Sequence, residues 1–234
     1  MGARRVLTVI ALAVLSSWAA AQLKPSLDAG AAMLAGGPEF RSTLPADRQK
    51  ALDHVLDQFQ LDLRAHGEGL QANTDKGLSP KERVAWAQKD QTELYARFTQ
   101  GVFAALSPDQ AERLRRLALR HYGPRMLRLP EVARRVGLSE EQRQAVAKRV
   151  AAFDHKSFDM SQGITNRMIH AINLRIHKGE NVGQEEVHAL ATKANAQVEA
   201  ARPKIQALRK KEDARIMALL RPTQRKAWEK SLAR

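Results

Sequence analysis

The feature that most constrains the fold is an apolar stripe of helical period that runs from Ser139 to His177. Its members recur at spacings of three, four or seven residues, which places them on one face of an α-helix. They are Val146, Val150, Phe153, Met160, Ile164, Met168, Ile172 and Ile176. At about 1.5 Å per residue this helix would be on the order of 55 Å long. One compact partner could not cover it, so the sequence predicts an extended helical element.

A second helical pattern follows a short segment that contains Gly179 and Gly183. It runs from Val187 to Leu219 with the apolar spacing of one helix face. Two long amphipathic segments joined by a short turn predict an antiparallel helical hairpin. No stretch alternates with period two for long enough to form a strand. The predicted fold is therefore all-α, a long antiparallel helical hairpin with additional packed helices.

The additional helices are predicted before the hairpin. The first begins at Ala46, and we expect Gly67, Gly69 and Gly77 to break it after His66. The others are predicted over residues 80–103, 107–122 and 131–136. The helix that starts after Ser107 should end before Gly123-Pro124, because proline disfavours helical geometry in the residue before it.

One short pattern recurs where predicted helices begin. Ser107 and Ser139 are placed to cap free backbone N–H groups, and the glutamine three residues later can complete a capping box. Pro108 and Pro222 occupy the first helical position, which tolerates a missing N–H. The residues of the three copies are Leu106, Ser107 and Gln110, then Leu138, Ser139 and Gln142, and finally Leu220 and Gln224.

These copies make the chain resemble the LTxxQ-motif (Spy/CpxP-like) family of bacterial periplasmic proteins. Serine replaces the family's threonine in two copies, and Arg221 replaces it in the third. The resemblance implies an ATP-independent, chaperone-like protein that binds unfolded or stress-damaged envelope proteins, with a homodimer as one arrangement. Two alternatives stay open: a metal-responsive sensor or regulator of envelope stress, and a structural protein that binds anionic envelope polymers.

The N-terminus has the pattern of a secretory signal peptide. Arg4 and Arg5 precede an apolar run, and small residues follow up to a cleavage site after Ala21. We therefore expect a periplasmic or otherwise secreted protein. Residues 22–42 are predicted to be a flexible leader and residues 43–234 a single helical domain, with a sub-boundary near residues 123–138. The chain contains no cysteine, so it can form no disulfide.

The chain is strongly basic. Its formal net charge of +14 becomes +12 when Arg4 and Arg5 are removed with the signal peptide. In a cytoplasmic protein this excess would suggest nucleic acid. Outside the cytoplasm the expected anionic partners are envelope surfaces and acidic segments of unfolded proteins, so no nucleic acid is expected. Basic residues interleaved with apolar ones are the candidates for client binding: Arg113, Arg116, Arg120, Arg128, Arg134 and Arg135.

No motif for catalysis is present. The sequence lacks the nucleophile, zinc-protease and phosphate-loop patterns that catalytic sites require. We therefore predict no enzyme, no catalytic residue and no cofactor. Histidine spacing is too loose for a structural metal site, and the weak candidates for metal ligands are His66, Glu68, His170 and His177.

Overall fold

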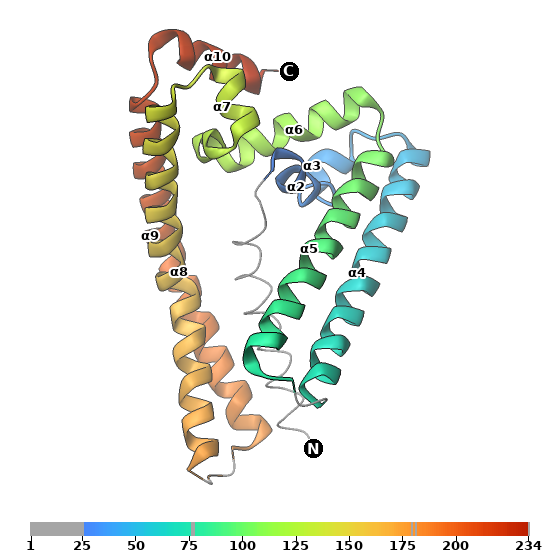
Figure 1. Cartoon of the computed structure of the whole chain (residues 1–234), viewed down its shortest axis with the longest axis vertical. Coiled ribbons are helices and arrows are strands. Elements are labelled where there is room, and N and C mark those ends of the chain that lie inside the picture. The colour runs from blue at the N-terminus through green and yellow to red at the C-terminus, as the bar shows by residue number, and fades with distance from the viewer. Residues whose placement is uncertain (1–25, 76–77, 179, 181, 234) are drawn as a thin grey trace. The chain divides into compact units, whose positions relative to one another are not determined.

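The computed structural model describes residues 26–75, 78–178, 180 and 182–233, and it is helical throughout its regular structure (Figure 1). The all-α prediction is confirmed, since this part of the chain contains no strand. The predicted signal peptide lies outside the described residues. None of the described helices has an apolar stretch long enough to cross a membrane.

The described chain divides into two compact units. One unit is Ser139–Leu219, and the other contains residues 26–138 together with residues 220–233. The second unit is thus formed by two separate stretches of sequence, and the residues of the first unit come between these stretches along the chain. The single helical domain over residues 43–234, with its sub-boundary near residues 123–138, stays a prediction.

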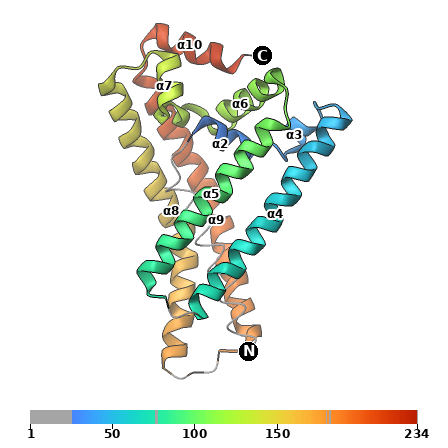
Figure 2. The ribbon, with the colours of Figure 1, turned by 45° about the vertical axis from the view of Figure 1, so that its right-hand side comes forward.

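The unit Ser139–Leu219 consists of α8 (Glu140–His177) and α9 (Gln184–Ala218), which pack side by side along their length (Figures 1 and 2). The two helices are antiparallel. Gln142 at the start of α8 donates a hydrogen bond of 2.7 Å to the carbonyl of Leu219, just beyond the end of α9. At the other end Ile172 packs with Val182 and Val187 in a small apolar cluster.

Ion pairs join the ends of α8 and α9. Arg175 donates hydrogen bonds to Glu186 and to Glu180, and these bonds raise the pKa of its guanidinium. Near the opposite end, buried Glu212 of α9 pairs with Arg149 of α8 at 3.6 Å and with Arg215 of its own helix. An ion pair between α8 and α9 is therefore present near each end of the pair: Arg175–Glu186 at one end and Arg149–Glu212 at the other.

In the other unit, α4 (Ala46–Asp75) and α5 (Pro80–Ala104) form a second pair of long helices (Figures 1 and 2). Phe59 of α4 stacks on Phe98 of α5 with ring centroids 4.0 Å apart. Next come α6 (Pro108–Tyr122), the 3₁₀ helix η1 (Gly123–Arg128) and α7 (Pro130–Val136). The last helix, α10 (Pro222–Leu232), packs on α6 and α7.

The predicted break of the first long helix at Gly67 and Gly69 is wrong, because α4 continues through both to Asp75. A glycine inside a helix costs about 1 kcal/mol relative to alanine. At Gly69 the missing side chain makes room for the ring of Trp86 of α5. A Cβ added at Gly69 would lie 2.6 Å from Cη2 of that ring and 3.0 Å from Cζ2. Trp86 also stacks on His66, so packing between helices outweighs the local preference.

The expectation of a flexible leader is also wrong for the residues that the structure describes. Residues 26–42 contain α2 (Leu27–Ala32) and α3 (Pro38–Arg41), with Leu27 and Phe40 buried. Ser26 caps α2, and the backbone N–H of Leu27 donates to Glu131 of α7 at 2.8 Å. Alanine and glycine allow this segment to pack closely against α5 and α6, although they give it no helical period.

The motif glutamines have two hydrogen-bonding roles. In each copy the Oε1 atom accepts from the N–H of the capping residue, at 2.8 Å for Gln110, 3.0 Å for Gln142 and 2.9 Å for Gln224. The amide nitrogens of Gln142 and Gln224 also donate to distant carbonyls, those of Leu219 and Gly137 respectively, both at 2.7 Å. Gln142 of the second copy thus binds the residue before Leu220 of the third copy, and Gln224 of the third copy binds the residue before Leu138 of the second.

Candidate functional site

Three of the predicted client-binding residues line one pocket. Arg113, Arg116 and Arg120 recur at spacings of three and four on α6, so they share one face of that helix. They form one wall of a pocket of about 660 Å³ between α6 and α3. The complete lining is Glu39, Phe40, Thr43, Asp109, Arg113, Arg116, Leu117 and Arg120. We call this the α3–α6 pocket.

The floor of the α3–α6 pocket is apolar and fixed. Phe40 and Leu117 expose only 1% and 7% of their surfaces, because both also belong to the core of this unit. Arg116 is held in place, since its Nη1 donates to the carbonyl of Ala233 at 3.2 Å and its Nε to that of Glu112 at 3.5 Å. Arg113 and Arg120 are exposed, and neither forms an ion pair or a side-chain hydrogen bond within the described part of the chain.

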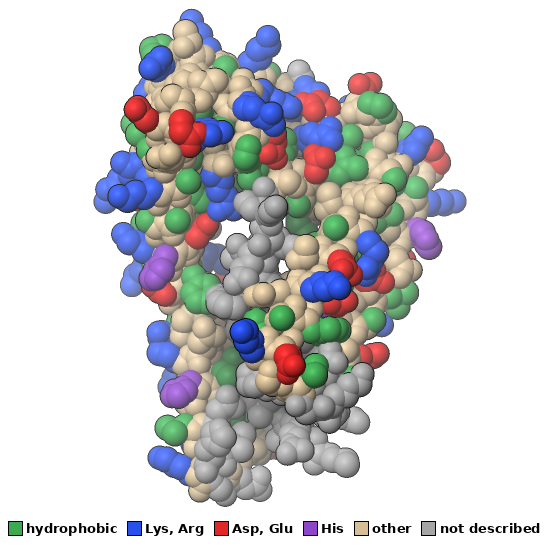
Figure 3. Space-filling view, in the orientation of Figure 1, with side chains coloured by type: hydrophobic (Ala, Val, Ile, Leu, Met, Phe, Trp, Pro, Cys, Tyr) green, Lys and Arg blue, Asp and Glu red, His purple; other side chains and the backbone are tan. Residues whose placement is uncertain are grey.

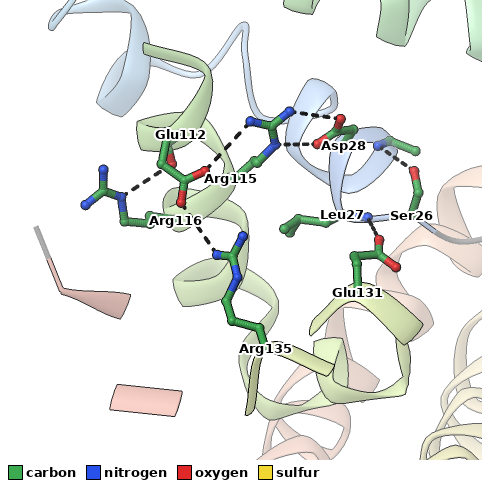
Figure 4. A network of polar contacts seen from close by, with 9 residues as sticks. Ser26, Leu27, Asp28, Glu112, Arg115, Arg116, Glu131 and Arg135 are labelled. Atoms are coloured by element: carbon green, nitrogen blue, oxygen red, sulfur yellow. Dashed lines mark hydrogen bonds and ion pairs between the residues drawn. The ribbon is translucent and has the colours of Figure 1, made fainter. Parts of the chain in front are cut away.

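Arg115, on the neighbouring face of α6, has a structural role (Figure 4). It donates two hydrogen bonds to Asp28 of α2, at 2.6 and 3.1 Å, and its guanidinium lies over the ring of Phe103. The bonds to Asp28 raise the pKa of Arg115. Glu112 approaches both Arg115 and Arg135, at 3.7 and 3.5 Å. This network fastens α2 to α6 and so fixes the segment that leads into α3.

The other predicted client-binding residues do not line the α3–α6 pocket. Arg135 pairs with Glu112, and Arg134 donates from Nε to the carbonyl of Pro130 at 3.4 Å. Arg128 is exposed at the end of η1 and has an interaction of its own. Only the residues that share a face of α6 are therefore brought together.

A second surface lies on the other unit, along the middle of the α8–α9 pair. Between Phe153 and Ile172 on α8, and between Ala194 and Glu212 on α9, none of the side chains is buried. Among the described residues of this unit, α8 and α9 are the only helices, so no third helix covers their apolar stripe. The stripe is consequently half-buried at Met160, Ile164, Met168, Val198, Ile205 and Leu208. We call this the central α8–α9 surface.

The central α8–α9 surface contains a shallow groove of about 280 Å³. Its apolar lining is Met160, Ile164, Ala200 and Ala201, and its polar lining is Arg167, Lys204, Gln197 and one acid, Asp159. Exposed basic side chains continue along α9, and Figure 3 shows Lys and Arg along the left-hand edge of the view, where Figure 1 places this pair. Arg167, Lys204, Lys210 and Lys211 make no ion pair with any described residue.

The residues proposed as weak metal ligands have other surroundings. His66 is paired with Asp90 and stacks on Trp86 with ring centroids 5.6 Å apart. Glu68 and His170 are exposed, and the side chain of His177 lies outside the described part of the structure. Within the described part of the chain, no group of three or more potential ligands is close enough to hold a metal ion.

Sequence reasoning missed the α3 side of the pocket. Glu39, Phe40 and Thr43 lie in the segment predicted to be a leader, and no periodicity marks them. The available signal was Gly37-Pro38-Glu39, which is a helix start with proline at the first position and an acid in the first turn. The sequence did indicate the central α8–α9 surface, because the predicted apolar stripe on residues 139–177 was too long for one compact partner to cover.

Comparison with known proteins adds no assignment, because no family model, curated protein or solved structure matches the chain. The α3–α6 pocket and the central α8–α9 surface are therefore the features that bear on function.

Proposed function

We propose that this protein is an ATP-independent, chaperone-like protein that binds unfolded or stress-damaged envelope proteins. The observation that supports this proposal is the central α8–α9 surface, where half-buried apolar side chains are flanked by basic ones. Such a surface can cover exposed apolar segments of a client and attract acidic ones. Binding of this kind is reversible and requires no nucleotide.

The balance of charge favours an acidic client over a second copy of this surface. Residues 195–211 of α9 contain Arg202, Lys204, Arg209, Lys210 and Lys211 against one acid, Glu199. Two such surfaces placed face to face would repel each other. A homodimer, if it forms, should therefore use a different face and leave this surface free for clients.

Localisation and partners follow from the same proposal. After removal of residues 1–21 the protein would act in the periplasm or outside the cell, on unfolded or misfolded envelope proteins. Its positive charge would also draw it to anionic envelope surfaces. That attraction is sensitive to salt, whereas apolar contact with a client is much less so.

The test is suppression of aggregation, measured by light scattering of a model protein with the chain from Gln22 onward, in EDTA and without ATP. Suppression is expected at near-equal ratios and should persist at moderate salt. Replacing Met160 and Ile164 by Gln should reduce the suppression about twofold or more, because the apolar contact area is lost while helix propensity is kept.

A charge-reversal pair tests the basic flank. Arg167→Glu with Lys204→Glu should weaken suppression of an acidic client. Lys148→Glu with Lys193→Glu is the matched control, since it changes the net charge equally at exposed positions of the same unit. Equal effects of the two pairs would show that net charge, and not this surface, is responsible. No suppression by the wild-type protein would refute the proposed function.

A further inference from the structure

The α3–α6 pocket has charges of both signs that its own unit leaves unpaired. Arg113, Arg120, Asp109 and Glu39 all line it, and none forms an ion pair or side-chain hydrogen bond with another described residue. The volume of about 660 Å³ lies within the range of roughly 300–1,000 Å³ that is typical of ligand pockets. Free charges around an apolar floor are the elements of a binding site for a charged organic ligand.

The charges follow a fixed order along α6. Asp109 lies in the first turn, and Arg113, Arg116 and Arg120 follow after four, seven and eleven residues. At about 1.5 Å per residue, Asp109 and Arg120 are roughly 16 Å apart along the helix axis. An extended peptide advances about 3.3 Å per residue, so about five residues span this row.

We propose that the α3–α6 pocket binds the first five or so residues of an acidic peptide chain that has a free amino terminus. The ammonium group lies toward Asp109, and acidic side chains lie toward Arg113 and Arg120. Between them, apolar side chains of the peptide contact the aliphatic stems of the arginines and the exposed part of Leu117. Arg116 adds a third positive charge to this row. Its side chain is already held by two backbone carbonyls, so its conformation need not be fixed on binding.

The acidic residues make a peptide a better ligand than a simple anion. Asp109 and Glu39 oppose a ligand that carries only negative charge, whereas they attract the ammonium group of a peptide. Arginine binds carboxylates with paired, planar hydrogen bonds, which suits the acidic side chains. The inference goes beyond the proposed function and does not rest on it, because the pocket and the central α8–α9 surface belong to different units.

Calorimetric titration tests the arginine end of the site. The full chain is titrated with the amidated peptide Ala-Leu-Glu-Leu-Glu. Arg113→Gln with Arg120→Gln should weaken binding about tenfold or more, since two charge-assisted contacts are lost. Lys226→Gln with Lys230→Gln removes the same charge from exposed positions of α10 in the same unit and should weaken binding less than about twofold.

Acetylation of the peptide tests the other end. The acetylated peptide should bind the wild-type protein about threefold or more weakly, because its ammonium group is lost. Asp109→Asn should bind the free and acetylated peptides more nearly alike, whereas Asp57→Asn, an exposed acid on α4, should behave as the wild type. This crossed comparison separates a contact with the ammonium group from a general effect of charge.

Three outcomes would overturn the inference: no binding to the wild-type protein, equal binding after the double arginine substitution, or equal affinity for the free and acetylated peptides. Circular dichroism checks that each variant keeps its helices. If the glutamine variant does not fold, Arg113→Lys with Arg120→Lys replaces it. That variant keeps the charge and should still weaken binding, because lysine lacks the planar pair of donors.

Discussion

At the scale of single residues, the third copy of the motif requires glutamine and not merely a hydrogen-bond acceptor. Gln224 is 7% exposed, accepts from the N–H of Arg221 through Oε1, and donates from Nε2 to the carbonyl of Gly137. A glutamate could perform only the first of these roles. The Arg221 side chain has no acceptor for the free N–H groups of the helix. In this copy, therefore, the capping box consists only of the bond from the Arg221 N–H to Gln224.

Gln224→Glu should therefore destabilise the protein by about 1–3 kcal/mol at pH 7, because it removes a buried donor and places a carboxylate against a carbonyl. Denaturant unfolding followed by circular dichroism measures the change. Gln110→Glu is the matched control, since Gln110 is only half-buried and makes just the capping contact. It should cost less than about 0.5 kcal/mol, and equal losses would show that capping alone explains the motif.

Glu82 makes the first turn of α5 sensitive to acid. Its carboxylate accepts from the N–H of Ser79 at 2.9 Å, and the hydrogen bonds to Ser79 lower the pKa of Glu82 below 4.5. A lowered folded-state pKa means that this contact stabilises the helix start above pH 4.5 and is lost as pH falls through the folded-state value. The amide NMR signal of Ser79 should titrate with a midpoint below 4.5, and Glu82→Gln should abolish that titration.

At the scale of the helices, alanine substitution at two glycines distinguishes the effect of packing between helices on stability from the effect of helix propensity. An added Cβ at Gly69 would lie 2.6 Å from the Trp86 ring, whereas at Gly163 of α8 it would meet only the flexible end of Arg167 at 3.4 Å. Gly69→Ala should destabilise the protein by about 1–3 kcal/mol through overpacking. Gly163→Ala should stabilise it by up to about 1 kcal/mol, because alanine is the better helix former.

Thermal unfolding of the two alanine variants decides between these effects. If Gly69→Ala also stabilised the protein, the Trp86 ring would have to move aside at little cost. The close approach of α4 and α5 would then not be the reason why α4 passes through its glycines.

The helices that could be predicted are those with a periodic stripe and a defined cap. Ser107 and Ser139 mark starts that the structure places within one residue, and Gly137 ends α7 in the left-handed conformation with φ 74°. The short helices α2 and α3 could not be predicted, because contacts distant in sequence stabilise them. Asp28 and Arg115 are 87 residues apart, and no local pattern reveals their pairing.

The same distinction applies to the candidate sites. The spacing of Arg113, Arg116 and Arg120 was enough to place them on one helix face. Their pocket also needs Phe40 and Glu39, whose position depends on how α2 and α3 pack. A helix face can be predicted from sequence, but the opposite wall of a pocket requires the tertiary fold.

At the scale of the whole molecule, the order of the units along the chain has a consequence for folding. Residues 220–233 belong to the same unit as residues 26–138, and α10 packs on α6 and α7. Trp228 of α10 is buried, as is Gln224. The unit Ser139–Leu219 is thus an insertion in sequence, and the unit that receives it has its own core, which includes Leu114, Leu119, Leu127 and Val132.

Removal of Ser139–Leu219 should leave a folded protein. Gln224 Nε2 lies 2.7 Å from the carbonyl of Gly137, so the two ends to be joined are near each other. A linker of about four residues, able to span roughly 13 Å, should connect Leu138 to Leu220 without strain. Circular dichroism should show a helical protein that unfolds cooperatively, and calorimetric titration should still detect the peptide at the α3–α6 pocket.

A variant within the excised protein shows whether this core is the native one. Gln224→Ala should lower its unfolding temperature, because the bond to Gly137 lies entirely within the remaining unit. Lys226→Ala, at an exposed position of the same helix, should have little effect. An excised protein without cooperative unfolding would mean that the unit depends on the α8–α9 pair for its stability, and the insertion would then be a structural necessity and not an addition to a self-sufficient fold.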